Sequence, residues 1–517
     1  TVIHCANVQP VNRQHVHKTE HSEMKAYCTQ NNILVTESTM NAFREAIFSV
    51  PFDDTCDGRC KPTWYMSIAI FLQHLICSAT ASRNTRKRSQ FKGNRLWTCS
   101  VPFPYALGEK VAPAVFRRSR ELPFERALEK LEEVGFIRII THDVIRHKCR
   151  EFALSRRFLD VLFPGDRTAY LNLEDRYGYL TDVYRRRMGP MTLEERLAQA
   201  MLRKCKVRHL TSTRNIPDKA FRERVAAVYD RLEALPVNID ALRMYCNEQP
   251  STVNRVYYHN FISHLCEAGV EAISLSPLIV SYRQVYRTAR LGGRSFEVGK
   301  GFQYLPKGMK WACLGQGYNY DIKSSQLEIL RHELQRIGLS DKNLKRLETD
   351  YITKKLGVTT DEVKQFRFAA VFSAGSVSLS VKSGVRKRLN KVLGDKRAEN
   401  VLKRWKKLMQ PLREDLKRLI EDYLATGTTN RYGLCVKNAV GQNFNCSWKN
   451  FSARQAWQPA QMHRKLLAHM LQGLESQAVY DYVASNKGVC ALEHDGFVTY
   501  EEITDWSHPY LLIEKKH

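Results

Sequence analysis

Two aspartates in the C-terminal half of the chain lie in contexts that suit metal binding. Asp321 lies in GYNYDIKSSQLEIL, where alternating aromatic and apolar residues predict a strand that leads into a helix. Asp495 lies in GVCALEHDGFVTY, where a turn at 494–496 would present the carboxylate between two strands. Hard divalent cations bind carboxylates, and a pair of such cations can catalyse phosphoryl transfer. Either aspartate alone is more often a turn or cap residue, so the hypothesis of a metal site rests on the pair.

The segment DEVKQFRFAAVFSAG, at residues 361–375, predicts a helix that binds a nucleotide. Lys364, Phe368 and Phe372 are spaced by four residues, so they would line one face of this helix. An ammonium group can meet phosphates while aromatic rings meet a base and a sugar, and Arg367 would add a second cation. The alternative is an amphipathic core helix that carries one exposed lysine.

The whole chain is strongly basic. Its 517 residues include 81 Lys and Arg against 53 Asp and Glu, which gives a net charge of +28. An excess of this size predicts a polyanionic partner, because each cation that neutralises a phosphate releases a counterion. Nucleic acid is the main prediction, and an anionic membrane surface is the alternative. Because no apolar run is long enough to cross a membrane, we expect no membrane partner and a location in the cytoplasm, or in the cytoplasm of a host cell.

The region after residue 60 predicts a DNA-binding module. A helix at 66–77 and a second helix at 123–134 precede two strands, at 136–140 and 151–154. This order is typical of the end of a winged-helix domain, in which a basic loop joins the two strands and contacts DNA phosphates. The basic residues of that loop are Arg146, Lys148 and Arg150. The alternative is a small α/β module that packs against the rest of the chain.

Three segments resemble motifs A, B and C of family A DNA polymerases and of the related single-subunit phage-type RNA polymerases. They occur along the chain in the same order as in that family. Motif A has a metal-binding Asp followed by Ser-Gln-hydrophobic-Glu, which Asp321 and the residues 325–328 match. Motif B has a Lys with aromatic residues four and eight positions later, which Lys364 and its two phenylalanines match. His494 and Asp495 match the His-Asp of motif C.

Three further segments resemble parts of the same family. TARLGGR at 288–294 is similar to the Thr-Gly-Arg segment that holds primer and template. Gln472 and Gly473 are similar to the Gln-Gly of the helix before motif C, where Gln contacts the template. The segment 428–433 is similar to the hairpin that returns from fingers to palm, and it contains Arg431.

The resemblance covers roughly residues 282–517 and implies a helix-rich α+β fold of the right-hand polymerase type. The implied divisions are an N-terminal arm at 1–60, the winged-helix-like domain at 61–165, a helical thumb-like region at 166–281, a palm at 282–330 and 428–517, and fingers at 331–427.

The resemblance also implies roles for individual residues. Asp321 and Asp495 would bind two Mg²⁺ ions, with Mn²⁺ as a substitute, and Lys364 would neutralise the leaving pyrophosphate. The implied nucleotide-binding residues are Gln326, Glu328, Arg367, Phe368 and Phe372, with Glu328 crowding the 2′ position. The implied nucleic-acid-binding residues are Arg290, Arg294, Arg431, Gln472 and His494.

The sequence departs from the family pattern at several positions. Gln326 follows Asp321 by a longer interval than in the family, so we expect either a bulge or a later start of the helix. Gly496 stands where the DNA enzymes have a second acidic residue and where the RNA enzymes have a small one. Thr360 stands at the position of the motif B arginine, and Phe372 lacks the usual tyrosine hydroxyl.

Together these features predict a template-dependent DNA polymerase that replicates a plasmid, virus or mobile element. Its partners would be nucleoside triphosphates and primer-template DNA, including a specific origin. A primase or single-subunit RNA polymerase is the nearest alternative, which Gly496 favours and Glu328 opposes. A non-catalytic replication initiator and a metal-dependent nuclease are further alternatives, and the sequence leaves the oligomeric state open.

Overall fold

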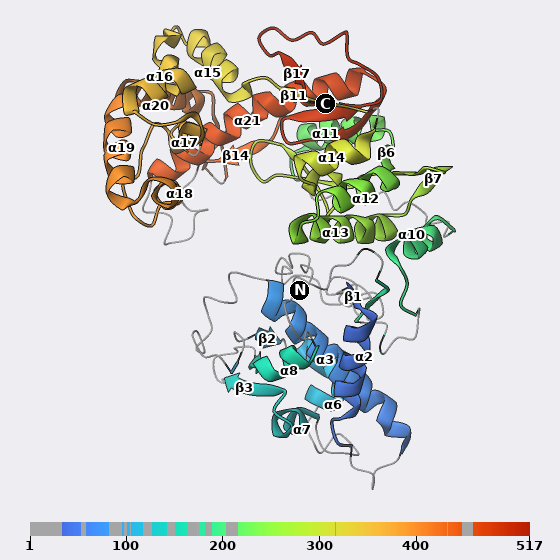
Figure 1. Cartoon of the computed structure of the whole chain (residues 1–517). Helices are drawn as coiled ribbons and strands as arrows, with labels where there is room; N and C mark the ends of the chain where they lie inside the picture. Colours follow the sequence, from blue (N-terminus) through green and yellow to red (C-terminus); the bar gives the residue numbers. More distant parts are fainter. Residues whose placement is uncertain are drawn as a thin grey trace. The chain divides into compact units, whose positions relative to one another are not determined.

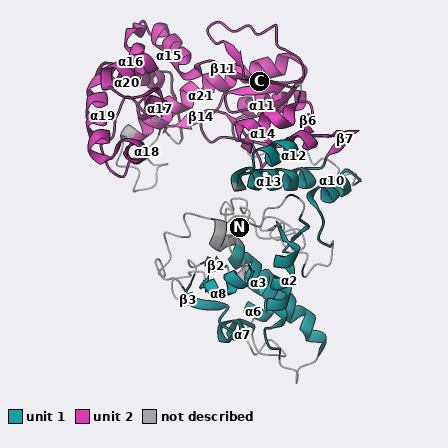
Figure 2. Cartoon of the chain, in the orientation of Figure 1, with its two compact units in different colours: residues 1–205, 242–269 teal, residues 206–241, 270–517 magenta. Residues whose placement is uncertain are grey.

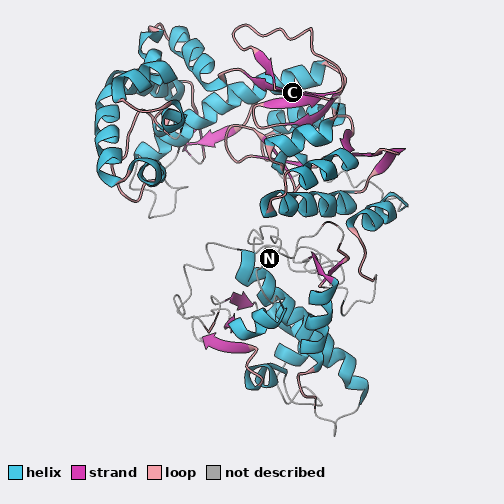
Figure 3. Cartoon of the chain, viewed as in Figure 1, coloured by secondary structure: helices cyan, strands magenta, loops and turns pink. Residues whose placement is uncertain are grey.

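The computed structural model describes residues 34–52, 58–81, 96–97, 101–103, 105–116, 127–141, 150–162, 173, 175–180, 183, 189–202, 216–315, 317–364, 366–431, 433–446 and 459–516. The chain forms two compact units, one of residues 1–205 with 242–269 and the other of residues 206–241 with 270–517 (Figure 2). In both units more of the described residues lie in helices than in strands, so the fold belongs to the helix-rich α+β class (Figure 3).

The first unit contains the helices and strands that the sequence predicts after residue 60. The long helix α3, Lys61–Ala81, covers the expected helix, and α7, Ala127–Glu133, ends before Gly135, whose φ is +72°. Strands β3, Ile137–Thr141, and β4, Arg150–Leu154, pair antiparallel as predicted. Strand β2, Val101–Phe103, adds a third strand at the other edge of β4. Arg146 and Lys148 lie outside the described residues, and Arg150 is the first residue of β4.

Aromatic rings form the centre of the first unit's core. Phe71 of α3 contacts Phe103, Phe116 and Phe152, with ring centroids 5.0–5.6 Å apart. These rings join the three-stranded sheet to the helices above it. The other elements of this unit are β1 Leu34–Thr36, α2 Glu37–Phe48, α5 Tyr105–Val111, α6 Pro113–Phe116, α8 Arg156–Leu162, β5 Tyr177–Tyr179, α10 Leu193–Leu202, most of α12 Ile239–Glu248, and α13 Thr252–Ala268.

A four-stranded antiparallel sheet is the centre of the second unit. Its strands run in the order β15 Val489–Leu492, β16 Gly496–Thr499, β11 Tyr318–Ile322 and β17 Ile513–Lys515. Strands β15 and β16 are fully buried on both faces. The sheet therefore brings the segment around Asp321 beside the segment around Asp495, which is far away in sequence (Figure 1).

The helix α21, Pro459–Ser485, runs along the second unit and contacts several elements (Figure 1). Its partners are α11 Lys219–Arg231, α15 Ser325–Arg336, α20 Gln410–Ala425 and the 3₁₀ turn Val371–Ser373. Buried apolar residues from all of these elements form one continuous core.

Helices α16 to α20 gather at one end of the second unit, away from the four-stranded sheet (Figure 1). Their bounds are α16 Thr349–Leu356, α17 Thr360–Lys364, α18 Gly384–Leu393, α19 Asp395–Leu408 and α20 as given above. The remaining elements of the unit are β6 Leu235–Asn238, β7 Glu271–Leu275, β8 Leu278–Tyr282, β9 Tyr286–Thr288, β10 Ser295–Glu297, α14 Lys307–Leu314, and the hairpin β12 Thr428–Asn430 and β13 Gly433–Lys437 with β14 Asn443–Asn445. The hairpin expected at 428–433 is confirmed.

The prediction of one continuous helix at 361–375 is wrong. Helix α17 ends at Lys364, and two 3₁₀ turns, Arg367–Ala369 and Val371–Ser373, follow it. The helix is interrupted where the buried Phe366 packs against Trp405, with ring centroids 4.5 Å apart. The segment then ends in the left-handed region at Ala374, with φ +50°. Tertiary contacts thus override the helical spacing.

No helix in the described part of the chain is both long and apolar enough to cross a membrane.

Candidate active site

Asp321 and Asp495 lie at neighbouring positions on paired strands. Asp321 is directly opposite Gly496, the residue after Asp495. The backbone N–H of Ile322 donates to the carbonyl oxygen of Asp495 at 2.9 Å, and the N–H of Glu493 donates to the carbonyl oxygen of Gly496 at 2.9 Å. The second bond closes the turn that the sequence predicts, and the first joins this turn to β11, so both aspartates lie at one place in the sheet.

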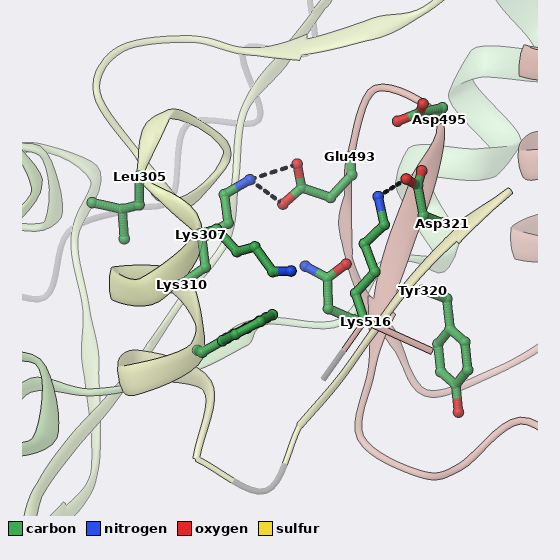
Figure 4. Close-up of a pocket in the computed structure, with 10 residues that line it drawn as sticks. Leu305, Lys307, Lys310, Tyr320, Asp321, Glu493, Asp495 and Lys516 are labelled. Atoms are coloured by element: carbon green, nitrogen blue, oxygen red, sulfur yellow. Dashed lines mark hydrogen bonds and ion pairs between the residues drawn. The ribbon is translucent and has the colours of Figure 1, made fainter. Parts of the chain in front are cut away.

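Both aspartates line one cavity of about 200 Å³ (Figure 4). Strand β11, the turn between β15 and β16, and Lys516 line one side of it, and helix α14 lines the other. Its lining residues are Leu305, Lys307, Lys310, Trp311, Asn319, Tyr320, Asp321, Glu493, Asp495 and Lys516. The cavity therefore contains the predicted pair of carboxylates, a third carboxylate and three lysines that the sequence analysis did not single out.

Two of the cavity's carboxylates are paired with lysines. Lys516 forms an ion pair with Asp321, and Lys310 donates to both carboxylate oxygens of Glu493 at 2.6 and 2.8 Å. The ammonium of Lys307 lies 4.1 Å from the ring centroid of Trp311. Figure 4 shows Lys307 and Lys310 on one side of the cavity, with Glu493 and the Lys516–Asp321 pair on the other.

Glu493 is an unusual acid because only 12% of its side chain is exposed. Burial raises the pKa of Glu493 to about 7; Lys310 opposes this shift, and Glu297 and Asp495 add to it. Asp495 is therefore close enough to influence the Glu493 carboxylate.

The donor set of the cavity fits a hard divalent cation. The carboxylates of Asp321 and Asp495 offer oxygen ligands, and Mg²⁺ commonly binds through one or two carboxylates while it keeps several waters. No group of three or more His, Cys, Asp and Glu side chains is arranged to hold a metal ion within the described ranges. The two aspartates would thus hold the cation with help from water or substrate, rather than as part of a closed protein site.

Gly496 leaves no room for a side chain. A β-carbon at this position would overlap the carbonyl oxygen of Tyr320 and lie 2.9 Å from the Cα of Asp321. An acidic residue at 496 is therefore incompatible with the pairing of β11 and β16. The close approach of β11 and β16 therefore requires glycine at 496.

Between Asp321 and Gln326 the chain leaves β11 through a turn. Residues 323–324 form this turn, and Ser324 adopts the left-handed conformation with φ +50°. Helix α15 then begins at Ser325.

Glu475 of α21 is a buried acid that sequence reasoning missed. Its carboxylate accepts from Ser325 Oγ at 2.6 Å, from Gln326 Nε2 at 2.9 Å and from Arg294 Nε at 2.7 Å. Burial raises the pKa of Glu475, while the ion pair with Arg294 and the bond from Ser325 oppose this rise. Gln326 and Arg294, predicted to bind nucleotide and nucleic acid, thus share one buried partner close to Asp321. An acid in the middle of a long helix gave no signal of this role.

The glycine pair of TARLGGR lies directly on α21. A β-carbon at Gly292 would overlap the side chain of Gln472, and the Gly292 N–H donates to His469 Nδ1 at 3.2 Å. Ser476 Oγ donates to the Gly292 carbonyl at 2.9 Å. His469 Nε2 lies 2.9 Å from the Gln442 carbonyl, so this ring is neutral with its proton on Nε2. Burial lowers the pKa of His469 to about 4.

The predicted nucleotide-binding residues are not among the described residues that line the cavity. Lys364 is exposed and pairs with Asp361 at 3.0 Å. Arg367 donates to Thr349 Oγ1 at 2.8 Å, and its guanidinium lies 4.2 Å from the ring centroid of Phe368.

Phe372 and Glu328 also lie outside the cavity lining. Phe372 is half-buried on the 3₁₀ turn that contacts α21. Glu328 is ion-paired with Arg331, which also donates to Asp341 at 3.1 Å.

The other predicted nucleic-acid contacts differ in their surroundings. Arg290 is exposed, as is Arg431 in the turn between β12 and β13. The ring of His494 packs on Phe296, with centroids 4.7 Å apart.

Comparisons with known proteins give likenesses among solved structures only. No family model matches the chain, and no curated protein matches it. Among solved structures, the chain is similar to the POL domain of Pol1 from M. smegmatis in complex with DNA primer-template and dNTP, at 11% identity and a TM-score of 0.31. The match spans 59% of this chain and 59% of that chain. A TM-score of 0.31 is too low to bear on function, so the functional proposal rests on the cavity.

Proposed function

We propose that the chain is a template-dependent nucleic-acid polymerase that transfers nucleotidyl groups from deoxynucleoside triphosphates at the Asp321–Asp495 cavity. The observation that carries the proposal is the convergence of these two aspartates on paired strands, with three lysines lining the same cavity. Paired carboxylates facing ammonium groups suit a reaction in which divalent cations and a polyphosphate must meet.

In this proposal Asp321 and Asp495 hold the Mg²⁺ ions. Bound Mg²⁺ would supply activation of the attacking 3′-hydroxyl and neutralisation of the leaving pyrophosphate. Lys307 and Lys310 would attract the phosphates, because both line the cavity from α14, with the Lys310 ammonium at the carboxylate of Glu493 (Figure 4). Glu475 would act as a positioning residue, because it fixes the start of α15 four residues after Asp321.

Lys364, Arg367, Phe368 and Phe372 remain proposed contacts of the incoming nucleotide. They lie at or after the end of α17, and the turn that carries Phe372 contacts α21, the helix that bears Gln472. Lys364 does not line the cavity, so it could contact a triphosphate bound there in two ways. Either the triphosphate extends beyond the cavity, or the segment that carries Lys364 moves toward it.

The choice between deoxyribose and ribose rests on Glu328 and Gly496. Gly496 is no argument for RNA synthesis, because the close approach of Tyr320 demands glycine there. The proposed role of Glu328 at the 2′ position requires its carboxylate, which Arg331 holds in an ion pair. That pairing is the observation that favours an RNA-synthesising enzyme as the second candidate.

The proposed partners are primer-template DNA and nucleoside triphosphates. A net charge of +28 favours a polyanion. The order of α7, β3 and β4, with β2 at the far edge of β4, supports a winged-helix-like module that recognises DNA. In this proposal the chain is divided into palm, fingers and thumb. Its proposed role is replication of a plasmid, virus or mobile element from its own origin.

Extension of a labelled DNA primer on a DNA template, with Mg²⁺ and either deoxynucleotides or ribonucleotides, tests the function. We expect extension by deoxynucleotides that is lost in Asp321→Asn and Asp495→Asn. Asp505→Asn is the matched control, since this exposed carboxylate accepts from Tyr482 outside the cavity. Extension with ribonucleotides alone would establish the second candidate. Full activity of both cavity variants would remove the proposed site.

A further inference from the structure

Lys516 reaches from an edge strand into the carboxylate cavity. Its backbone N–H donates to the Asn319 carbonyl at 2.8 Å, which extends the pairing of β17 with β11. Its side chain then forms the ion pair with Asp321 (Figure 4). The neighbouring Lys515 instead pairs with Glu502 at 3.1 Å and lies over the ring of Tyr318. Successive residues of a strand point to opposite faces, so only one of the two lysines enters the cavity.

The ammonium of Lys516 stands at the carboxylate proposed to bind metal. The cavity contains three carboxylates, Asp321, Glu493 and Asp495, and three ammonium groups, those of Lys307, Lys310 and Lys516. Lys310 is committed to Glu493 through two hydrogen bonds. Lys516 is therefore the counter-ion of Asp321 before any divalent cation binds.

A divalent cation and an ammonium group compete for one carboxylate, since their like charges repel at ion-pair distance. The Lys516 side chain is free to leave, because 38% of it is exposed while Asp321 is only 14% exposed. A displaced ammonium would lie in the same cavity as Lys307, where two cations can meet the oxygens of a phosphate.

We propose that Lys516 is an exchangeable counter-ion of Asp321: a divalent cation displaces its ammonium, which then joins Lys307 in binding a phosphate group of the substrate. The inference rests on the proposed function for the identity of the cation site. It adds that binding of the cation and binding of the phosphate are coupled through one lysine, so each strengthens the other.

The exchange is tested by measuring Mn²⁺ binding to the full chain by electron paramagnetic resonance, in the absence of nucleic acid. Removal of the competing ammonium in Lys516→Met should tighten Mn²⁺ binding about 10-fold, a typical size for coupling between binding events. Lys515→Met removes the same charge from the opposite face and should bind Mn²⁺ like the wild type. Lys516→Arg keeps the competitor and should bind Mn²⁺ no more tightly than the wild type. Thermal unfolding of each variant checks that it is folded.

Inorganic pyrophosphate provides the second readout. In the wild type, saturating Mn²⁺ should tighten pyrophosphate binding, and this gain should shrink in Lys516→Met but not in Lys515→Met. Equal Mn²⁺ affinity in Lys516→Met and wild type would overturn the exchange while leaving the metal site intact. Mn²⁺ binding to Lys516→Met that survives a second change, Asp321→Asn, would overturn the metal site itself and with it the exchange.

Discussion

Asp321 and Gly496 lie directly opposite each other on β11 and β16, and they do so because position 496 has no side chain. This pairing brings the carboxylate of Asp321 beside the turn that carries Asp495. The arrangement of the candidate site thus depends on a glycine as much as on the two acids.

Gly496→Ala should destabilise the protein by at least about 3 kcal/mol, because the added methyl overlaps the backbone of β11 and cannot rotate away. Urea unfolding, monitored by a signal from the second unit, measures the loss of stability. Gly384→Ala is the control, because nothing lies within 4 Å of a β-carbon there at the start of α18. Equal stability of the two variants would show that β11 and β16 can separate without cost.

Glu475→Gln should cost about 3 kcal/mol of unfolding free energy, the usual loss when one partner of a buried ion pair is removed. The carboxylate is fully buried and accepts bonds from Arg294, Ser325 and Gln326. Denaturant unfolding measures it against Glu421→Gln, whose carboxylate is 61% exposed and pairs with Lys417 at 3.8 Å. The control should change stability by less than about 0.5 kcal/mol.

His469 should make the protein less stable in mild acid. Its native pKa of about 4 lies below the ordinary value of 6.5, so the unfolded chain binds the proton first. The contribution is fully present above pH 6.5 and is lost as the pH falls toward 4, by about 2 kcal/mol at pH 5. His469→Gln can accept from Gly292 and donate to Gln442 without titrating.

The loss of stability between pH 7.5 and pH 5, measured by urea unfolding, should be smaller in this variant by that amount. The buried His259, whose pKa is lowered to about 3, contributes equally to both proteins. The same pH dependence in wild type and variant would contradict the assignment to His469.

Lys364→Ala should slow primer extension about 100-fold, the scale for removing one charge-stabilising group from a transition state. Binding of primer-template DNA should not change, since Lys364 is an exposed residue paired only locally with Asp361. Single-turnover extension and DNA binding are measured in parallel, with Lys364→Arg to retain the charge. Full extension by Lys364→Ala together with a slow Lys310→Ala would assign the phosphate contact to the cavity lysine.

Local patterns in the sequence are enough to predict the strands around Asp321 and Asp495, the turn between 493 and 496, and the β3–β4 ribbon. Each of these depends on neighbouring residues, whose alternation or turn chemistry the chain displays directly. The two aspartates could be paired as one site because both have this strand-and-turn context.

Other features depend on contacts between distant segments, which no local period encodes. The helix expected at 361–375 breaks where Phe366 packs on Trp405. A β-carbon on Gly375 would lie 2.5 Å from the Cα of Arg413 in α20, so glycine is required there. Glu475 meets Ser325 and Arg294 from helices and loops more than a hundred positions away. Lys516 reaches Asp321 because β17 pairs with β11, and this register arises from packing of the whole sheet rather than from either strand.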